Sequence, residues 1–293
     1  MAGRRLAHRP LTVRMVGLLD PLRAASAAHG GNIRWSAAVV GEGGPASALD
    51  RLDADEVLPT ASIGKVFLLI TTLDQLERGL LDGAERVQVE DIDRVADSGL
   101  LQFLDGQTVS VLDLCRFVGA VSDNLATNVL LRRVGLDRVT EMTAQLGIRR
   151  SALHDSVRDV RGPEHVPFLS TGCAAELAAL IRQIANAETI SRSVSAGVVE
   201  LLRLNTDLSM VASAFALDPL AHVDADLGLR LFNKTGTQTG TRADIGWVEP
   251  AGQGSGVAYA VIARFEDSRE VRRSVLDAMR AVGNGIRRLI TGS

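Results

Sequence analysis

The order of hydrophobic patterns along the chain is the feature that most limits its fold. Runs typical of β-strands occur near both ends, whereas apolar residues recur every three to four positions through the middle. Short glycine-bearing turns separate the strands near the C-terminal end, which favours antiparallel pairing. We predict strands at 33–40, 46–52, 58–61, 229–233, 243–248 and 257–265, and helices at 11–29, 62–79, 109–121, 124–135, 136–146, 173–187, 193–204 and 267–289.

This order predicts an α+β fold in which both ends of the chain contribute to one antiparallel β-sheet. Helices near the N- and C-termini would flank the sheet, and an all-helical lobe would be inserted between its strands. The predicted boundaries are 1–60 and 206–293 for the sheet lobe and 61–205 for the helical lobe. The default place for a small-molecule site is the cleft between two such lobes.

The composition excludes several classes of protein. The 293 residues are 46% hydrophobic and 23% charged, which is typical of a globular protein rather than a disordered or collagen-like one. A nucleic-acid-binding protein would carry a basic surplus and stacking aromatics, but this chain has a net charge of -3 and only 3% aromatic residues. Cys115 and Cys173 are too few for a disulfide framework or a zinc site, and the five histidines lack metal-ligand spacing. We therefore expect no nucleic-acid partner, no metal and free, buried thiols.

The sequence also bears on location. No apolar run approaches the roughly 18 residues that a transmembrane helix needs, so no membrane partner is expected. The apolar stretch at 15–19 is bounded by Arg14, Asp20 and Pro21 and is too short for the core of a signal peptide. As the sequence is written we expect a cytoplasmic monomer, or a secreted or periplasmic protein if the chain is a processed form.

Only two of the 32 basic residues are lysines, Lys65 and Lys234. Arginine keeps its proton in a protein, whereas lysine can lose it. These two positions are therefore the places to look for chemistry that arginine cannot perform.

The first lysine ends the segment Ser62-Ile63-Gly64-Lys65, which opens a predicted helix whose next residues, 66–70, are all apolar. The N–H of Ser62 would lie among the unpaired donors at the start of this helix, where it can bind an oxyanion. Lys65, three positions on, would share a helix face with Ser62. If burial and a neighbouring cation lower its pKa, the amine could take the serine proton. A surface lysine fits such an apolar helix poorly.

Two further segments carry polar groups in contexts typical of a site. Ser122-Asp123-Asn124 falls between two predicted helices, where it can direct two side chains into a cleft. Ser122 or Asp123 could equally be the N-cap of the following helix. The segment Lys234-Thr235-Gly236-Thr237 continues a strand, and Gly236 permits close backbone approach to a ligand.

With these three segments and the following Gly240-Thr241-Arg242, the chain resembles the class A β-lactamase family from about residue 33 to the final helix. The resemblance implies a serine hydrolase that opens a β-lactam or related amide through an acyl-Ser62 intermediate, with no metal or organic cofactor. It implies Ser62 as nucleophile, Lys65 in its activation and Ser122 as proton relay to the leaving nitrogen. The substrate would be bound by Asn124 at its side-chain amide, by Lys234, Thr235 and Arg242 at its carboxylate, and by the backbone N–H groups of Ser62 and Thr237 at the oxyanion.

One catalytic element of that family is missing. The glutamate that positions the deacylating water would fall near Val157 or Arg158, and the region 153–171 contains no Glu-x-x-Leu-Asn motif. Glu164 by residue type and Asp159 by position could replace it, or both could be solvated loop acids. Because a general base contributes about two to four powers of ten, acylation could survive while turnover fails.

The sequence thus leaves three functions open. The first is a β-lactamase. The second is a peptidase, esterase or acyl-transfer enzyme of the same fold with poor β-lactam turnover. The third is a non-catalytic β-lactam-binding module.

Overall fold

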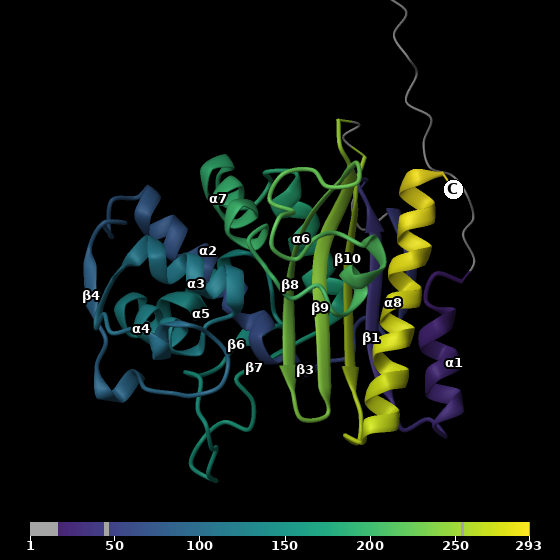
Figure 1. The fold of residues 1–293 in the computed structure, drawn as a ribbon, viewed down its shortest axis with the longest axis horizontal. Coiled ribbons are helices and arrows are strands. Elements are labelled where there is room, and N and C mark those ends of the chain that lie inside the picture. The colour runs from purple at the N-terminus through teal and green to yellow at the C-terminus, as the bar shows by residue number, and fades with distance from the viewer. Residues whose placement is uncertain (1–16, 44–46, 253–254, 293) are drawn as a thin grey trace, which may run out of the picture.

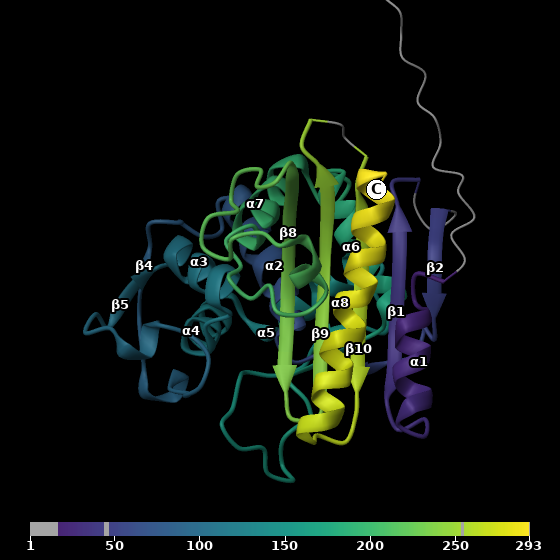
Figure 2. The same ribbon diagram turned by 45° about the vertical axis from the view of Figure 1, so that its right-hand side comes forward.

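The computed structural model describes residues 17–43, 47–252 and 255–292 and centres on a five-stranded antiparallel sheet. The strand order β2-β1-β10-β9-β8 places the first two strands beside the last three, as predicted (Figures 1 and 2). β8 forms one edge of the sheet, and β1 joins the two parts by pairing with β10. The strands are β1 (Arg34–Gly41), β2 (Ala48–Leu52), β8 (Leu229–Gln238), β9 (Thr241–Pro250) and β10 (Val257–Arg264).

Helices cover both faces of this sheet. The terminal helices α1 (Asp20–Ala28) and α8 (Arg269–Thr291) pack together on one face, with the 3-10 helix η5 (Val211–Phe215) against α8 (Figures 1 and 2). α6 (Ala174–Ala185) packs on the opposite face, against β1, β9 and β10. Each face has its own apolar core, because successive strand residues point to opposite sides.

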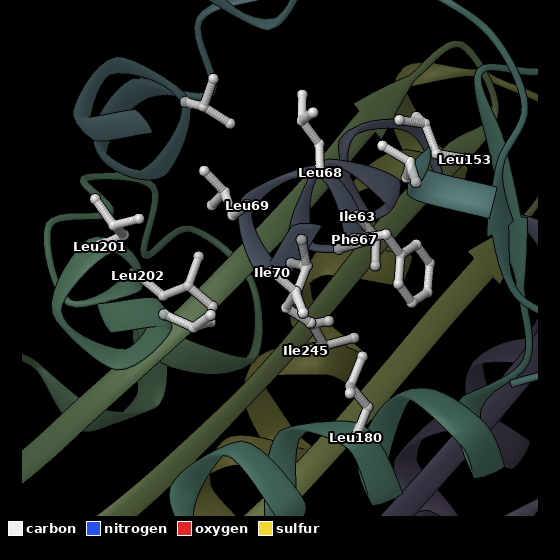
Figure 3. Close-up of a cluster of buried hydrophobic side chains, with 14 of the residues drawn as sticks. Ile63, Phe67, Leu68, Leu69, Ile70, Leu153, Leu180, Leu201, Leu202 and Ile245 are labelled. Carbon is white, nitrogen blue, oxygen red and sulfur yellow. The ribbon is translucent and has the colours of Figure 1, made fainter. Parts of the chain in front are cut away.

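α2 (Lys65–Glu77) lies at the centre of the helical region. Its first turns are apolar, and Val66 to Ile70 are each at most 1% exposed. Ile70 of α2 is grouped with Leu180 of α6 and Ile245 of β9, so α2 belongs to the core between sheet and helices (Figure 3). The other helices of this region are α3 (Val111–Val121), α4 (Asn124–Val134), α5 (Leu136–Gln145) and α7 (Arg192–Leu202).

The region 61–205 also contains short strands, although its sequence predicts helices alone. β4 (Arg86–Gln88) pairs with β5 (Thr108–Ser110), and β7 (Ser170–Gly172) pairs with both β3 (Leu58–Pro59) and β6 (Ala152–Leu153). Strands of two or three residues are too short to show an alternating pattern. α6 belongs to the predicted helical lobe but packs on the sheet. The division of the chain into two lobes at residues 60/61 and 205/206 stays a prediction.

The ends of the predicted elements differ by a few residues. α1 begins at Asp20, whereas the predicted helix begins at residue 11. Residues 1–16, which include the first six residues of that predicted helix, lie outside the described part of the chain. Cys115 and Cys173 are buried free thiols. None of the described helices has the length and the apolar run that crossing a membrane requires.

Candidate active site

Ser62 lies in the 3-10 helix η2 (Ala61–Gly64), which leads directly into α2. Residues three apart are eclipsed in a 3-10 helix, so this turn directs Ser62 and Lys65 to the same side. Ala61 adopts a left-handed conformation with φ of 50° at the entry to the turn. The hydroxyl of Ser170 on β7 donates to the Ala61 carbonyl and fixes this entry. The Ser62 side chain is partly exposed, and among the described residues its hydroxyl has no hydrogen-bond partner.

Lys65 is the first residue of α2 and is fully buried. Its Nζ donates to the Ser122 carbonyl at 2.7 Å and to Asn124 Oδ1 at 2.8 Å, and it lies 3.3 Å from Ser122 Oγ. Burial and the charge of Lys234 lower the pKa of Lys65 well below its usual value, and Asp123 only partly opposes them. The amine is therefore held in position in an environment that favours its neutral form.

Ser122 connects the two lysines. Its Oγ accepts a hydrogen bond from Lys234 Nζ at 3.0 Å and a longer one from Lys65 Nζ. Ser122 ends α3 in a left-handed conformation with φ of 54°, which a non-glycine residue adopts at a cost. This conformation places both its carbonyl and its hydroxyl within reach of the Lys65 amine.

The next two residues have different roles. Asp123 is the N-cap of α4, because its Oδ1 accepts from Ala126 N at 2.9 Å, and its other oxygen accepts from the N–H groups of Leu100 and Leu101. Of the two candidates for this cap, the structure thus selects Asp123. Asn124 donates through Nδ2 to the Ala96 carbonyl at 3.1 Å, which leaves its Oδ1 facing Lys65.

Lys234 reaches the same centre from β8. It is fully buried, and its Nζ donates to Ser122 Oγ and, at 2.8 Å, to the Thr235 carbonyl. Burial lowers the pKa of Lys234 to about 8, against the opposing effect of Asp207 and Asp244. Hence β8, α2 and the α3–α4 turn each contribute a polar group to one cluster.

Gly236 explains how β8 can lie so close to η2. A Cβ atom at this position would be 2.1 Å from the Thr60 carbonyl oxygen and 3.2 Å from Ser62 N. Both are backbone atoms, so no side-chain movement could relieve the first contact. The glycine therefore brings the backbone of Ser62 against the strand that carries Lys234.

The remaining predicted substrate-binding residues lie at the β8–β9 hairpin. Thr235 is buried, Thr237 is exposed, and Thr237 is paired in register with Arg242 of β9. The Arg242 guanidinium donates to the carbonyls of Gln238 at 3.0 Å and Thr241 at 2.7 Å, which fixes it at this end of the sheet.

The two candidate deacylation acids do not join the cluster. Asp159 accepts a hydrogen bond from Ala96 N at 2.9 Å, and a carboxylate oxygen of the exposed Glu164 lies 2.9 Å from His165 Nδ1. No hydrogen bond or ion pair joins Asp159 or Glu164 to Ser62 or Lys65 among the described residues. Their roles stay predictions.

Asn128, which was not predicted from the sequence, lies one helical turn after Asn124 on α4. Its side chain donates to the Val157 carbonyl at 3.0 Å and accepts from Val157 N at 2.8 Å. These two hydrogen bonds fix the backbone of Val157, at the position where the family's glutamate was expected. The i,i+4 spacing of the two asparagines on one helix face was the signal that could have revealed it.

Asp244 was also missed, although a carboxylate within an otherwise apolar strand is unusual. It is fully buried and accepts hydrogen bonds from Asn233 Nδ2 at 3.0 Å, Ala212 N at 3.2 Å and the Tyr259 hydroxyl at 3.3 Å. Burial raises the pKa of Asp244 to about 7. In register it is paired with Thr235, so it lies on the sheet directly beside the predicted carboxylate-binding residues.

Comparison with known proteins places this geometry in a family. The beta-lactamase regulatory protein BlaB of Streptomyces cacaoi is 32% identical over 111 residues, which are 37% of this chain and 36% of that protein. A beta-lactamase from Sphaerobacter thermophilus has the same fold, with a TM-score of 0.76 and 22% identity over 91% of this chain and 96% of that one.

A leucine-to-glutamate variant of PBP-A, solved as an acyl-enzyme complex with penicillin G, also has this fold. Its TM-score is 0.74, with 17% identity over 92% of this chain and 97% of that one. The sequence model of the beta-lactamase enzyme family matches residues 20–288. Because that match covers nearly the whole chain, the protein belongs to the β-lactamase enzyme family.

Proposed function

We propose that the protein is a class A-type serine hydrolase that β-lactams acylate at Ser62. The observation that carries this proposal is the buried Lys65 amine, which is hydrogen-bonded to Ser122 and Asn124 while its pKa is lowered. A neutral amine beside a serine at the start of a helix is what nucleophile activation requires. Because the site groups all come from one chain, we propose a functional monomer.

In the proposed reaction, Lys65 takes the Ser62 proton as the serine oxygen attacks the lactam carbonyl carbon. The backbone N–H groups of Ser62 and Thr237 stabilise the oxyanion. The C–N bond then breaks, and the leaving nitrogen receives the Ser122 hydroxyl proton. Ser122 is suited to this step because its oxygen lies between two amines, from which it can recover a proton.

Substrate binding would use the groups around this centre. Lys234, Thr235 and Arg242 would bind the carboxylate, and Asn124 would bind the side-chain amide of the substrate. An arginine fixed by two carbonyls and a buried lysine provide the charge for the carboxylate.

We propose that deacylation is slow. Val157 occupies the position fixed by Asn128, and its side chain packs against the apolar core. Asp159 and Glu164, the other candidates, are bonded elsewhere. An acyl-enzyme without a base to activate water would persist.

The test is to incubate the protein with benzylpenicillin and follow its intact mass with time. A long-lived adduct of one penicillin on Ser62, absent in Ser62→Ala, supports the proposal. A transient adduct together with hydrolysed penicillin would support the proposed hydrolase function but refute slow deacylation. No adduct at any time would overturn the proposed function.

A sensor is the second candidate, because the curated relative from Streptomyces cacaoi is named a regulatory protein. The chain spans about a third of the length of that relative. A non-catalytic sensor would bind a β-lactam without acylation, and Lys65→Ala would leave its affinity largely intact.

A further inference from the structure

A cavity lies between the C-terminal part of α7 and the start of β8. Its volume is about 340 Å³, within the range of about 300–1,000 Å³ that is usual for small-ligand sites. None of the residues predicted for the active site lines it. Phe232 of its lining precedes Lys234 by two strand residues, or about 7 Å along β8.

The floor of this cavity is aromatic. Phe232 and Trp247 are directly opposite each other in the β8–β9 register and are each 4% exposed. A cross-strand aromatic pair provides a flat apolar surface on which a hydrocarbon or aromatic group can pack. Val199 of α7 and Ala185 of α6 extend the apolar lining.

Two of the four charged residues in the lining neutralise each other. Glu249 accepts a hydrogen bond from Trp247 Nε1 at 3.0 Å and lies 3.9 Å from the Arg230 guanidinium. These groups are opposite each other in the strand register. They therefore have partners without a ligand.

Arg203 and Asp224 are different. Arg203 makes no ion pair or side-chain hydrogen bond with the described residues, and its Nε is buried without a partner. Asp224 is exposed, and it makes neither kind of contact with the described part of the chain. Both line the cavity, but they are not within ion-pair distance of each other. A buried donor without a partner is costly, and such groups are frequently satisfied by a ligand or water.

We propose that this cavity binds a free α-amino acid with an apolar or aromatic side chain. Arg203 binds the carboxylate, Asp224 binds the ammonium group, and the side chain packs on Phe232 and Trp247. The single positive and single negative group without partners match the two charges of a zwitterion. A simple anion would be repelled by Asp224, and a simple cation by Arg203.

The experiment measures binding of L- and D-phenylalanine to the full chain by calorimetry and by tryptophan fluorescence. We expect saturable binding of at least one enantiomer and a fluorescence change that is lost in Trp247→Phe. The other tryptophan, Trp35, lies in the core on the opposite face of the sheet and provides a constant signal.

Two derivatives test each charge separately. N-acetylphenylalanine lacks the ammonium group and phenylalaninamide lacks the carboxylate, and each should bind at least about tenfold more weakly, because a charged hydrogen bond is lost. Arg203→Leu should weaken phenylalanine binding by a similar factor. This variant should no longer bind phenylalanine more tightly than phenylalaninamide. Asp224→Asn should likewise stop discriminating against the N-acetyl compound.

Arg287→Leu and Asp105→Asn, which change exposed charges elsewhere, are the matched controls and should bind as the wild type does. Absence of binding by both enantiomers would overturn the proposal. Equal binding of phenylalanine and both derivatives would also overturn it. Acylation at Ser62 plays no part in this test, so its outcome is independent of the proposed hydrolase function.

Discussion

The cluster around Ser122 and the loop at 154–169 border the same site but use their charged groups in opposite ways. In the cluster, two buried lysines share the Ser122 hydroxyl, and each has a lowered pKa. In the loop, Asp155 accepts hydrogen bonds from Arg158 and Arg161. Burial alone would raise the pKa of Asp155, but these two arginines hold it well below its usual range.

This difference separates the two halves of a hydrolytic reaction. The cluster provides an amine that can change its protonation, as acylation requires. In the loop, Asp155 is paired with two arginines, Asp159 accepts from a backbone N–H, and Val157 lies where a base is expected. A chain can therefore keep the first half of the chemistry and lack the second.

The largest expected effect comes from Lys65→Arg, which replaces an amine that can release its proton by a guanidinium that cannot. We expect the rate of acylation by benzylpenicillin to fall by about 10²–10⁴-fold, the usual contribution of a general base. Intact-mass time courses measure the rate, with the exposed Ser193→Ala as the unaffected control. An acylation rate within a few-fold of the wild type would contradict a role for the Lys65 amine.

Val157→Glu should supply the carboxylate base that deacylation lacks. Asn128 fixes this backbone position, and we expect the new carboxylate to activate water near the acylated serine. We expect the lifetime of the penicilloyl adduct to shorten by about 10- to 100-fold, the lower part of the general-base range. Val157→Gln, which has the same shape without a charge, should leave the lifetime unchanged. Equal lifetimes for both variants would mean that the loop does not face the acyl group.

The sequence predicts the cluster better than the loop, and the reason is physical. Lys65, Ser122 and Lys234 belong to short segments whose backbone is set by a helix start, a helix–helix turn and a strand, so spacing alone places them. The loop geometry depends on contacts between residues far apart, such as Asn128 with Val157 and Asp159 with Ala96. Spacing can place Asn128 on the same helix face as Asn124, but it does not identify the distant residue that Asn128 contacts. For the same reason the buried network of Asp244 could not be predicted.

Asp244→Asn tests the electrostatics beneath the cluster. The pKa of Asp244 is about 7 in the folded protein and about 4 in an unfolded chain, so the native state retains a proton that the unfolded state loses. Raising the pH from about 4 to 7 should therefore cost on the order of 1 kcal/mol of stability per pH unit, with no further loss above 7.

Urea unfolding between pH 4 and 8 measures this slope. Relative to the wild type, Asp244→Asn should lose that part of the dependence and gain relative stability as the pH rises. Asp105→Asn, an exposed loop substitution, should keep the wild-type dependence. An unchanged slope in Asp244→Asn would show that the carboxyl is not held protonated.

The smallest expected effect compares one glycine in each region. Gly236→Ala would place Cβ 2.1 Å from the Thr60 carbonyl oxygen, so β8 and η2 must separate. We expect a loss of about 1–3 kcal/mol of stability, as for overpacking, with slower acylation because Ser62 moves relative to Lys234. For Gly162→Ala in the loop, the three atoms nearest to the new Cβ belong to the Glu164 carboxylate, an exposed group on a flexible side chain that can move away, so neither quantity should change. Thermal unfolding and acylation rates of the two variants check the comparison directly. Equal effects of the two substitutions would mean that the cluster tolerates displacement as well as the loop does. The close contact between β8 and η2 would then not be what positions Ser62.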